Sequence, residues 1–135
     1  MYIDDNTSLT KLFLCLGKEY GFTALTAHSI KEGYVLIQKE MPDVIITDIY
    51  MPDGDGFSLT ANIKTDPDPK IHSIPVIACS VTYAIQGKKI FLLGGTKFIN
   101  DKPYSIDKLN EILEGVVPKL IPIKSDEKNK RGLKE

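Results

Sequence analysis

The sequence has little net charge, few cysteines and no long apolar run, and each of these absences argues against a class of protein. Its 135 residues carry a net charge of −1, so no overall electric field favours binding to nucleic acid or to an anionic membrane. No apolar run approaches the ~20 residues that a membrane-spanning helix needs. The amino terminus has acids at positions 4 and 5 and lacks the charged-then-apolar order of a secretion signal. We therefore expect a protein that acts away from membranes and nucleic acid.

Cysteine is scarce, and both copies, Cys15 and Cys79, stand among apolar neighbours. This context favours buried free thiols in a reducing compartment over a disulfide bond. We therefore expect a cytoplasmic protein in which both thiols are buried. Hydrophobic residues make up 42% of the chain and charged residues 26%, which is ordinary for a globular protein, and the length suits one compact domain.

Short apolar runs alternate with segments of helical periodicity along most of the chain. Strands are predicted at residues 1–3, 22–27, 44–47, 75–79 and 97–100. Helices are predicted from Leu9 to Gly17 or Gly21, between Ser29 and Met41, and at residues 57–64, 83–93 and 106–116, with a loop at 65–69. Strands and helices that alternate in this way form a parallel sheet with helices on both faces.

The run VIITDIYMPDGDGF, residues 44–57, places one carboxylate, Asp48, at the end of a buried strand. The pair Asp4 and Asp5 follows the first strand, and Lys102 follows the last. Open α/β sheets carry their sites at the carboxyl ends of the strands, so these side chains are expected to meet. Magnesium prefers oxygen ligands, and one or two carboxylates with a phosphate suffice to hold it. The sequence therefore predicts a magnesium site that serves phosphoryl chemistry on an aspartate.

Phosphoryl transfer to a carboxylate gives an acyl phosphate and needs a cation and a hydroxyl donor near the phosphoryl oxygens. Lys102 fits the cation, and Ser80, just past the fourth strand, fits the hydroxyl donor. Taken singly, each is more simply an ordinary surface lysine or strand-end serine, and Asp4 and Asp5 could instead cap the first helix. The occupation of all four strand ends together favours the site.

The turn after Met51 carries two more acids and two glycines. Asp53 and Asp55 are interpreted as turn and cap residues rather than as metal ligands. Gly54 and Gly56 fit positions that need unusual backbone angles.

Four segments of the chain resemble the receiver domain of two-component response regulators: IDDN (3–6), IITDIYMPDGDGF (45–57), IPVIACS (74–80) and KP (102–103). The resemblance implies a flavodoxin-like (βα)5 fold, a doubly wound five-stranded parallel sheet with strand order 2-1-3-4-5, for residues 1–119. Residues 120–135 are interpreted as a charged carboxyl-terminal tail or a linker stub.

The resemblance also implies a role for each acid of the site. Asp48 is expected to be the phosphoacceptor. Asp5 is expected to bind Mg²⁺ directly and Asp4 through a water molecule. The backbone carbonyl of Tyr50, two residues after the acceptor, is expected to complete the protein ligands.

Further residues are expected to sense the phosphoryl group. By resemblance, Ser80 is the switch hydroxyl, the Val81 backbone contacts the phosphoryl group, and Lys102 pairs with it. Phe98 takes the role of the aromatic switch residue. The bond between Lys102 and Pro103 is expected to be cis, as is usual in the family, although only about 5–6% of X-Pro bonds are cis in general.

The chain departs from the family pattern in three places. The first strand is short. Val81 stands where alanine or glycine is usual and is expected to narrow access to the phosphoryl group. One residue is added in Asn100-Asp101, which predicts a bulge before Lys102. Asp101 could compete for the ammonium of Lys102 or act as a solvated loop acid.

The function that follows is a phosphorylation-dependent switch and not an enzyme. A histidine kinase or phosphotransfer protein would phosphorylate Asp48, and the face of helix 4, strand 5 and helix 5 would then bind a downstream partner or a second copy. The alternative is a receiver-shaped interaction module that is not phosphorylated.

Two enzyme or cofactor classes fit the residues less well. An Asp-x-Asp phosphatase needs a general-acid aspartate where this chain has Tyr50. A flavodoxin needs a phosphate-binding loop after the first strand, where Asp4 and Asp5 have the wrong charge.

Overall fold

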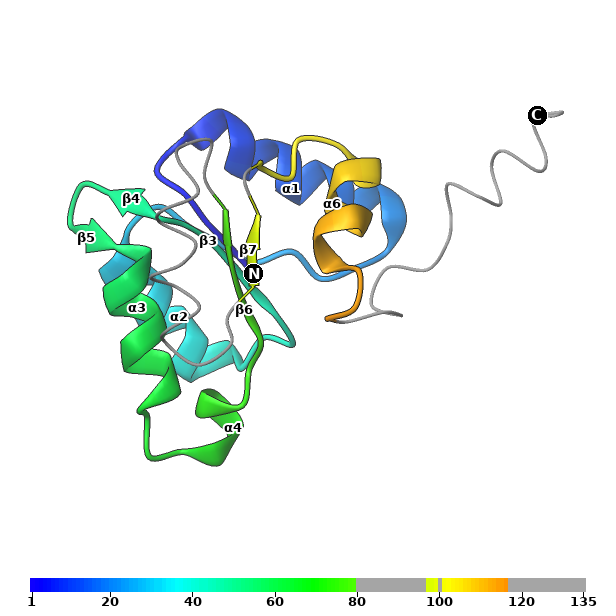
Figure 1. The fold of residues 1–135 in the computed structure, drawn as a ribbon. Coiled ribbons are helices and arrows are strands. Elements are labelled where there is room, and N and C mark those ends of the chain that lie inside the picture. Colours follow the sequence, from blue (N-terminus) through cyan, green and yellow to red (C-terminus); the bar gives the residue numbers. More distant parts are fainter. Residues whose placement is uncertain (80–96, 100, 117–135) are drawn as a thin grey trace, which may run out of the picture.

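The computed structural model describes residues 1–79, 97–99 and 101–116, and its centre is a five-stranded sheet with helices on both faces (Figure 1). The strands are β1 (Tyr2–Ile3), β2 (Thr26–Ala27), β3 (Ile45–Asp48), β6 (Val76–Cys79) and β7 (Lys97–Ile99). They are parallel and lie in the order β2-β1-β3-β6-β7. This order is the predicted 2-1-3-4-5, and the flavodoxin-like α/β fold is confirmed.

Two pairs of helices cover the two faces of the sheet (Figure 1). The helices are α1 (Thr7–Tyr20), α2 (Ile30–Glu40), α3 (Gly56–Lys64), a single turn α4 (Pro69–His72) and α6 (Ile106–Leu113). α1 and α6 pack on one face, and α2 and α3 pack on the other. The helix predicted at 83–93 lies outside the described residues, as does the predicted tail at 120–135.

The strands are buried on both sides because helices cover both faces of the sheet. Successive residues of a strand point to opposite faces and so enter different cores. Tyr2 and Ile46 enter the core with α1 and α6, whereas Ile3 and Ile45 enter the core with α2 and α3. Asp4 and Asp48 each come two residues after a side chain of the first core. The pleat therefore brings both carboxylates toward the same face, at the carboxyl edge of the sheet.

The helices begin at side chains that accept hydrogen bonds from their first amides. Asn6 caps α1 by accepting from the N–H groups of Ser8 and Leu9, so the alternative in which the acid pair caps this helix is wrong. Ser29 caps α2, and Asp55 caps α3 as predicted.

Several local features differ from the sequence prediction. β2 is shorter than predicted, because Phe22 and Ala24 pack against the core with α1 rather than extend the strand. α4 begins at Pro69, the last residue of the predicted loop, and was not predicted. The turn after Asp48 forms a small antiparallel hairpin of β4 (Tyr50–Met51) and β5 (Gly54–Asp55).

The two cysteines have different environments, and the prediction that both are buried is wrong for one of them. Cys79 is buried in β6, but Cys15 is exposed on α1, and both are free thiols. Apolar neighbours in sequence do not imply burial in a helix, because adjacent residues lie about 100° apart around its axis. Phe13 and Leu16 face the core, and Cys15 does not. Within the described part of the chain, no helix has the length and hydropathy to cross a membrane.

Asp53 connects the hairpin to the start of α2. Its carboxylate accepts hydrogen bonds from the N–H groups of Ile30 at 2.9 Å and Lys31 at 3.1 Å. These two bonds to the helix amino terminus lower the pKa of Asp53 below its usual value. The interpretation as a turn residue missed this contact, which joins residues 23 positions apart.

We expect Asp53→Asn to lower the melting temperature by a few degrees at neutral pH. Because folding lowers this pKa, the stabilisation is present above the unfolded-state pKa of about 3.9 and is lost as the pH falls through the folded-state pKa. Thermal unfolding at about pH 7 and about pH 2 measures the difference between wild type and variant. Glu40→Gln, which neutralises an exposed acid at the other end of α2, is the control. A loss of equal size at both pH values would contradict the prediction.

Candidate functional site

The predicted acids meet at the carboxyl edge of the sheet. Asp4 follows β1, Asp48 ends β3, and the register of Ile3 with Thr47 brings them level with each other. Carboxylate oxygens of Asp4, Asp5 and Asp48 lie within 4.8 Å of one another. Asp4 and Asp48 are buried, whereas Asp5 is exposed. The cluster offers carboxylate oxygens, which Mg²⁺ prefers as ligands, and it is open to solvent at Asp5.

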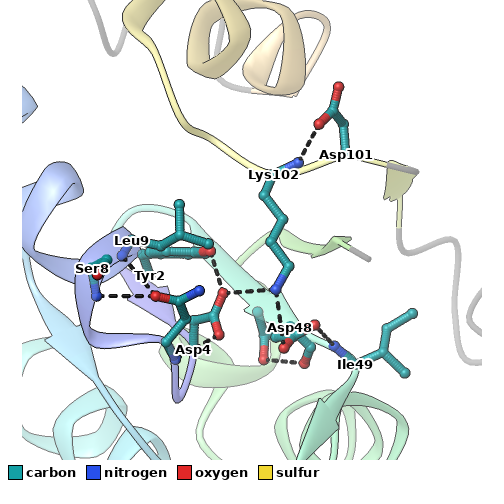
Figure 2. A network of polar contacts seen from close by, with 10 residues as sticks. Tyr2, Asp4, Ser8, Leu9, Asp48, Ile49, Asp101 and Lys102 are labelled. Carbon is teal, nitrogen blue, oxygen red and sulfur yellow. Dashed lines mark hydrogen bonds and ion pairs between the residues drawn. The ribbon is translucent and has the colours of Figure 1, made fainter. Parts of the chain in front are cut away.

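Lys102 reaches the same cluster from the loop before α6 (Figure 2). Its Nζ lies 3.1 Å from Oδ2 of Asp4 and 3.4 Å from Oδ2 of Asp48. A single ammonium therefore bridges two buried carboxylates that come from different strands. Among the described residues, three carboxylates and one ammonium meet here, which leaves an excess of negative charge that a divalent cation would offset.

Burial and neighbouring charges shift the pKa values of Asp48 and Lys102. Burial, and then the charge of Asp4, raise the pKa of Asp48, while Lys102 and the N–H of Ile49 oppose this rise. Burial lowers the pKa of Lys102, but the two carboxylates outweigh burial and the pKa is raised. The lysine is therefore charged at neutral pH, and ionised Asp48 is less favourable in the folded protein than in the unfolded chain.

The turn after Asp48 depends on a glycine. The N–H of Gly56 donates to the carbonyl of Ile49 at 2.7 Å. A Cβ added at Gly56 would lie 2.9 Å from the carbonyl oxygen of Asp48, so this position needs glycine for close approach rather than for an unusual backbone angle. The prediction of an unusual angle holds for Gly54, whose φ is 157°. Tyr50 lies in β4, with its side chain half-exposed.

Asp101 orders the loop that carries Lys102. Its Oδ1 accepts the backbone N–H of Lys102 at 2.9 Å, and its Oδ2 lies 3.0 Å from Nζ of Lys108 on α6. Tyr104 donates a weaker hydrogen bond to the same oxygen at 3.3 Å. Asp101 therefore joins the loop to α6 through Lys108. The ammonium of Lys102 pairs with Asp4 and Asp48 and not with Asp101.

The predicted cis bond is wrong, because the peptide bond between Lys102 and Pro103 is trans. The N–H of Tyr104 donates to the carbonyl of Lys102 at 2.8 Å, which forms a γ-turn centred on Pro103. This turn requires the carbonyl oxygen of Lys102 and the Cα of Pro103 on the same side of the peptide bond. Only the trans isomer has that arrangement, so the loop geometry and the isomer agree.

Sequence reasoning missed one residue of the site, Tyr2. Its hydroxyl donates to Oδ2 of Asp4 at 2.5 Å, and both side chains are fully buried (Figure 2). Burial, together with the bond to Asp4, raises the pKa of Tyr2, so the hydroxyl keeps its proton and donates. The signal in the sequence is the two-residue spacing from Asp4, which places both side chains on the same side of β1.

Several predicted site residues cannot be placed. Ser80 and Val81 lie outside the described residues, as does Asn100, where the bulge was predicted. Phe98 pairs with Ala78 through the backbone of β7, and its side chain also lies outside the described part.

A family model for the response regulator receiver domain matches residues 1–114. The chain belongs to this family. The matched segment of the receiver domain spans all five strands, the acid cluster and Lys102. The resemblance inferred from the sequence is therefore confirmed.

Two curated relatives differ in how much of their length this chain covers. The polar-differentiation response regulator DivK of Brucella ovis is 30% identical over 115 residues, which are 84% of this chain and 91% of DivK. The probable transcriptional regulator ycf27 of Guillardia theta is 28% identical over 117 residues, which are 87% of this chain but only 44% of ycf27. The chain thus spans most of one relative and less than half of the other.

Solved structures share the fold. The chemotaxis protein CheY4 of Vibrio cholerae superposes with a TM-score of 0.76 at 23% identity, over 86% of this chain and 95% of CheY4. A chain of the CheX-CheY-BeF3-Mg²⁺ complex of Borrelia burgdorferi gives a TM-score of 0.72 at 24% identity, over 85% of each chain.

Proposed function

We propose that this receiver domain is a phosphorylation-dependent signalling switch in which Asp48 accepts the phosphoryl group and Mg²⁺ is the cofactor. The observation that supports the proposal is the convergence of Asp48, two further acids and Lys102 at one edge of the sheet. Membership in the receiver family gives independent support. The domain acts by changing its binding partners rather than by turning over a substrate.

The metal would be held by Asp5, Asp48 and the Tyr50 carbonyl, with Asp4 contributing through water. When bound, Mg²⁺ would neutralise charge on the incoming phosphoryl group. The acid cluster offers the oxygen ligands for this role, and the relative excess of carboxylates over ammonium groups supports a divalent cation. The complex of the Borrelia neighbour also contains Mg²⁺.

The protein's own groups then perform the transfer. A carboxylate oxygen of Asp48 attacks phosphorus, the new O–P bond forms, and the donor's P–N or P–O bond breaks with its electrons on the leaving group. Lys102 moves from Oδ2 of Asp48 to the phosphoryl oxygens, because these oxygens carry more negative charge and attract the ammonium more strongly. The lysine can make this move while it keeps its contact with Asp4.

The added charge is proposed to reach the partner face through the residues beside Lys102. Ser80 would donate its hydroxyl to the phosphoryl group, and the Val81 backbone would contact it. Phe98 would then repack the face formed by β7, α6 and the predicted helix at 83–93. The donor would be a histidine kinase or phosphotransfer protein, and the face would bind a downstream protein or a second copy.

We expect acetyl phosphate with Mg²⁺ to add one phosphate to the full chain. Intact-mass spectrometry should show a single phosphate shift that is absent when Mg²⁺ is chelated. Hydroxylamine should remove the shift, because an acyl phosphate reacts with this nucleophile and a phosphoserine does not.

The outcomes separate the alternatives. No shift with Mg²⁺ present would favour an interaction module that is not phosphorylated. A steady release of phosphate far beyond one equivalent, in proportion to donor supplied, would favour an enzyme instead. A shift that resists hydroxylamine would contradict an aspartyl phosphate.

A further inference from the structure

Among the described residues three donors hold Asp4, and Tyr2 is the side-chain donor that the proposed phosphoryl chemistry does not use. Oδ2 of Asp4 accepts from the hydroxyl of Tyr2 at 2.5 Å and from Nζ of Lys102 at 3.1 Å. Oδ1 accepts the backbone N–H of Asn6 at 3.0 Å. A carboxylate oxygen has two favourable acceptor directions. As far as the described residues show, both directions of Oδ2 are therefore taken, and Oδ1 keeps one.

The hydroxyl of Tyr2 is fixed in place by the core. Its ring packs against Phe13 of α1 with a centroid separation of 5.5 Å, and its side chain belongs to the core under α1 and α6. The side chain has no exposed surface, so water does not compete for the bond to Asp4. The hydrogen bond from Tyr2 to the carboxylate of Asp4 is therefore held by the folded core and shielded from solvent (Figure 2).

We propose that Tyr2 is a positioning residue that holds Oδ2 of Asp4 beside Lys102 and thereby weakens Mg²⁺ binding at the cluster. The inference rests on the proposed function, because it concerns the same metal site. A hydrogen-bond donor partly neutralises the carboxylate and occupies an acceptor direction that a metal, or a water bound to it, would otherwise use. Tyr2 thus changes the Mg²⁺ affinity of the site through its bond to Asp4, and its own hydroxyl does not touch the phosphoryl group.

The direction of the effect separates this role from a merely structural one. Removal of the hydroxyl in Tyr2→Phe leaves Asp4 with more unbalanced negative charge and a free acceptor direction. We expect the dissociation constant of Mg²⁺ to fall by roughly fivefold to tenfold, as one lost charge-assisted hydrogen bond allows. A structural role predicts only a lower melting temperature, with Mg²⁺ binding unchanged or weaker.

The test is a calorimetric titration of the full chain with MgCl₂ and no phosphodonor. Tyr34→Phe is the matched control, because the Tyr34 hydroxyl also donates to an aspartate, Asp66, at 2.5 Å. This second pair joins α2 to the loop after the carboxyl end of α3, away from the acid cluster. We expect Tyr34→Phe to leave Mg²⁺ affinity unchanged.

A double-mutant cycle assigns the effect to Asp4. In an Asp4→Asn background, Tyr2→Phe should have little further effect on Mg²⁺ affinity, since no carboxylate remains for the hydroxyl to restrain. Tyr2→Leu, which removes ring and hydroxyl together, should shift the affinity in the same direction while it lowers the melting temperature further than Tyr2→Phe does.

The outcomes also separate this inference from the proposed function. If wild type binds Mg²⁺ but Tyr2→Phe binds it equally or more weakly, the inference is overturned and the proposed function stands. Equal tightening in the Asp4→Asn background would also overturn the inference. If wild type itself binds no Mg²⁺, the metal-dependent function fails, and the inference fails with it.

Discussion

Replacing Asp48 by asparagine is expected to abolish phosphate uptake without lowering the stability of the folded protein. The amide has no ionised oxygen with which to attack phosphorus, so the single phosphate shift with acetyl phosphate should disappear. The amide oxygen can still accept the Ile49 N–H that Oδ1 accepts at 2.9 Å. The variant therefore keeps the local backbone geometry while it loses the chemistry.

The stability of this variant follows from the electrostatics of the site. Burial and the charge of Asp4 raise the pKa of Asp48, so its ionisation opposes folding at neutral pH. For a carboxyl group with a raised pKa, the favourable contribution is present below the unfolded-state value of about 3.9 and is lost as the pH rises through the folded-state value. We expect Asp48→Asn to gain no more than about 1 kcal/mol at neutral pH, because the edge of the site is partly solvated.

Intact mass and thermal unfolding measure the two halves of this prediction. For phosphate uptake, Asp53→Asn is the matched control, since it neutralises a nearby acid of the same turn region and should still accept phosphate. Unfolding of Asp48→Asn should also depend less steeply on pH than unfolding of wild type in the range above pH ~4. Phosphate uptake by Asp48→Asn, or a large loss of stability in Mg²⁺-free buffer, would contradict the prediction.

The largest loss of stability is expected for Lys102→Met. The Nζ of Lys102 is the cation that offsets two carboxylates, at 3.1 Å from Asp4 and 3.4 Å from Asp48. Methionine keeps the apolar stem but leaves both acids without that ion pair. Because the lysine side chain is 17% exposed, we expect the free energy of unfolding to fall by about 2–3 kcal/mol, somewhat less than for a completely buried pair.

Magnesium should rescue part of this loss. A divalent cation replaces the missing positive charge, so added Mg²⁺ should raise the melting temperature of Lys102→Met more than that of wild type. Phosphorylation should nevertheless slow strongly, because the phosphoryl oxygens lose the ammonium that would pair with them. Denaturant unfolding with and without Mg²⁺ and the rate of the mass shift measure these effects.

Lys64→Met provides the control for burial of a lysine stem. Its Nζ donates to the backbone carbonyl of Ile74 at 3.1 Å, and burial lowers its pKa. No Mg²⁺-dependent rescue is expected for this variant, because its ammonium is not part of the acid cluster. Equal rescue of both variants by Mg²⁺ would show that the effect does not come from the site.

The architecture was predictable because the decisive information is local. Each strand is a short apolar run between helical segments, and parallel strands all present their carboxyl ends to the same edge. The positions of Asp4, Asp48 and Lys102 relative to those runs were therefore enough to predict that they meet. The caps at Ser29 and Asp55 were predictable for the same reason, since each acts within three residues of itself.

Features that depend on contacts between distant residues were not predictable in this way. The bond from the start of α2 to Asp53 spans 23 positions, and its donors depend on how the helix is placed beside the hairpin. The exposure of Cys15 depends on the rotation of α1 about its axis. The trans bond at Pro103 depends on the turn that follows Lys102.

The sequence alone determined the strands, the acids at their ends and the chemistry that those acids share, because strand formation and side-chain alternation are local rules, whereas the order of the strands came from the resemblance to receiver domains. Only the tertiary structure decided which atoms pair within the site. It placed the Tyr2 hydroxyl and the Lys102 ammonium on the same oxygen of Asp4 and directed Asp101 to Lys108 instead. These pairings depend on register, helix placement and loop path, which no short stretch of the chain contains.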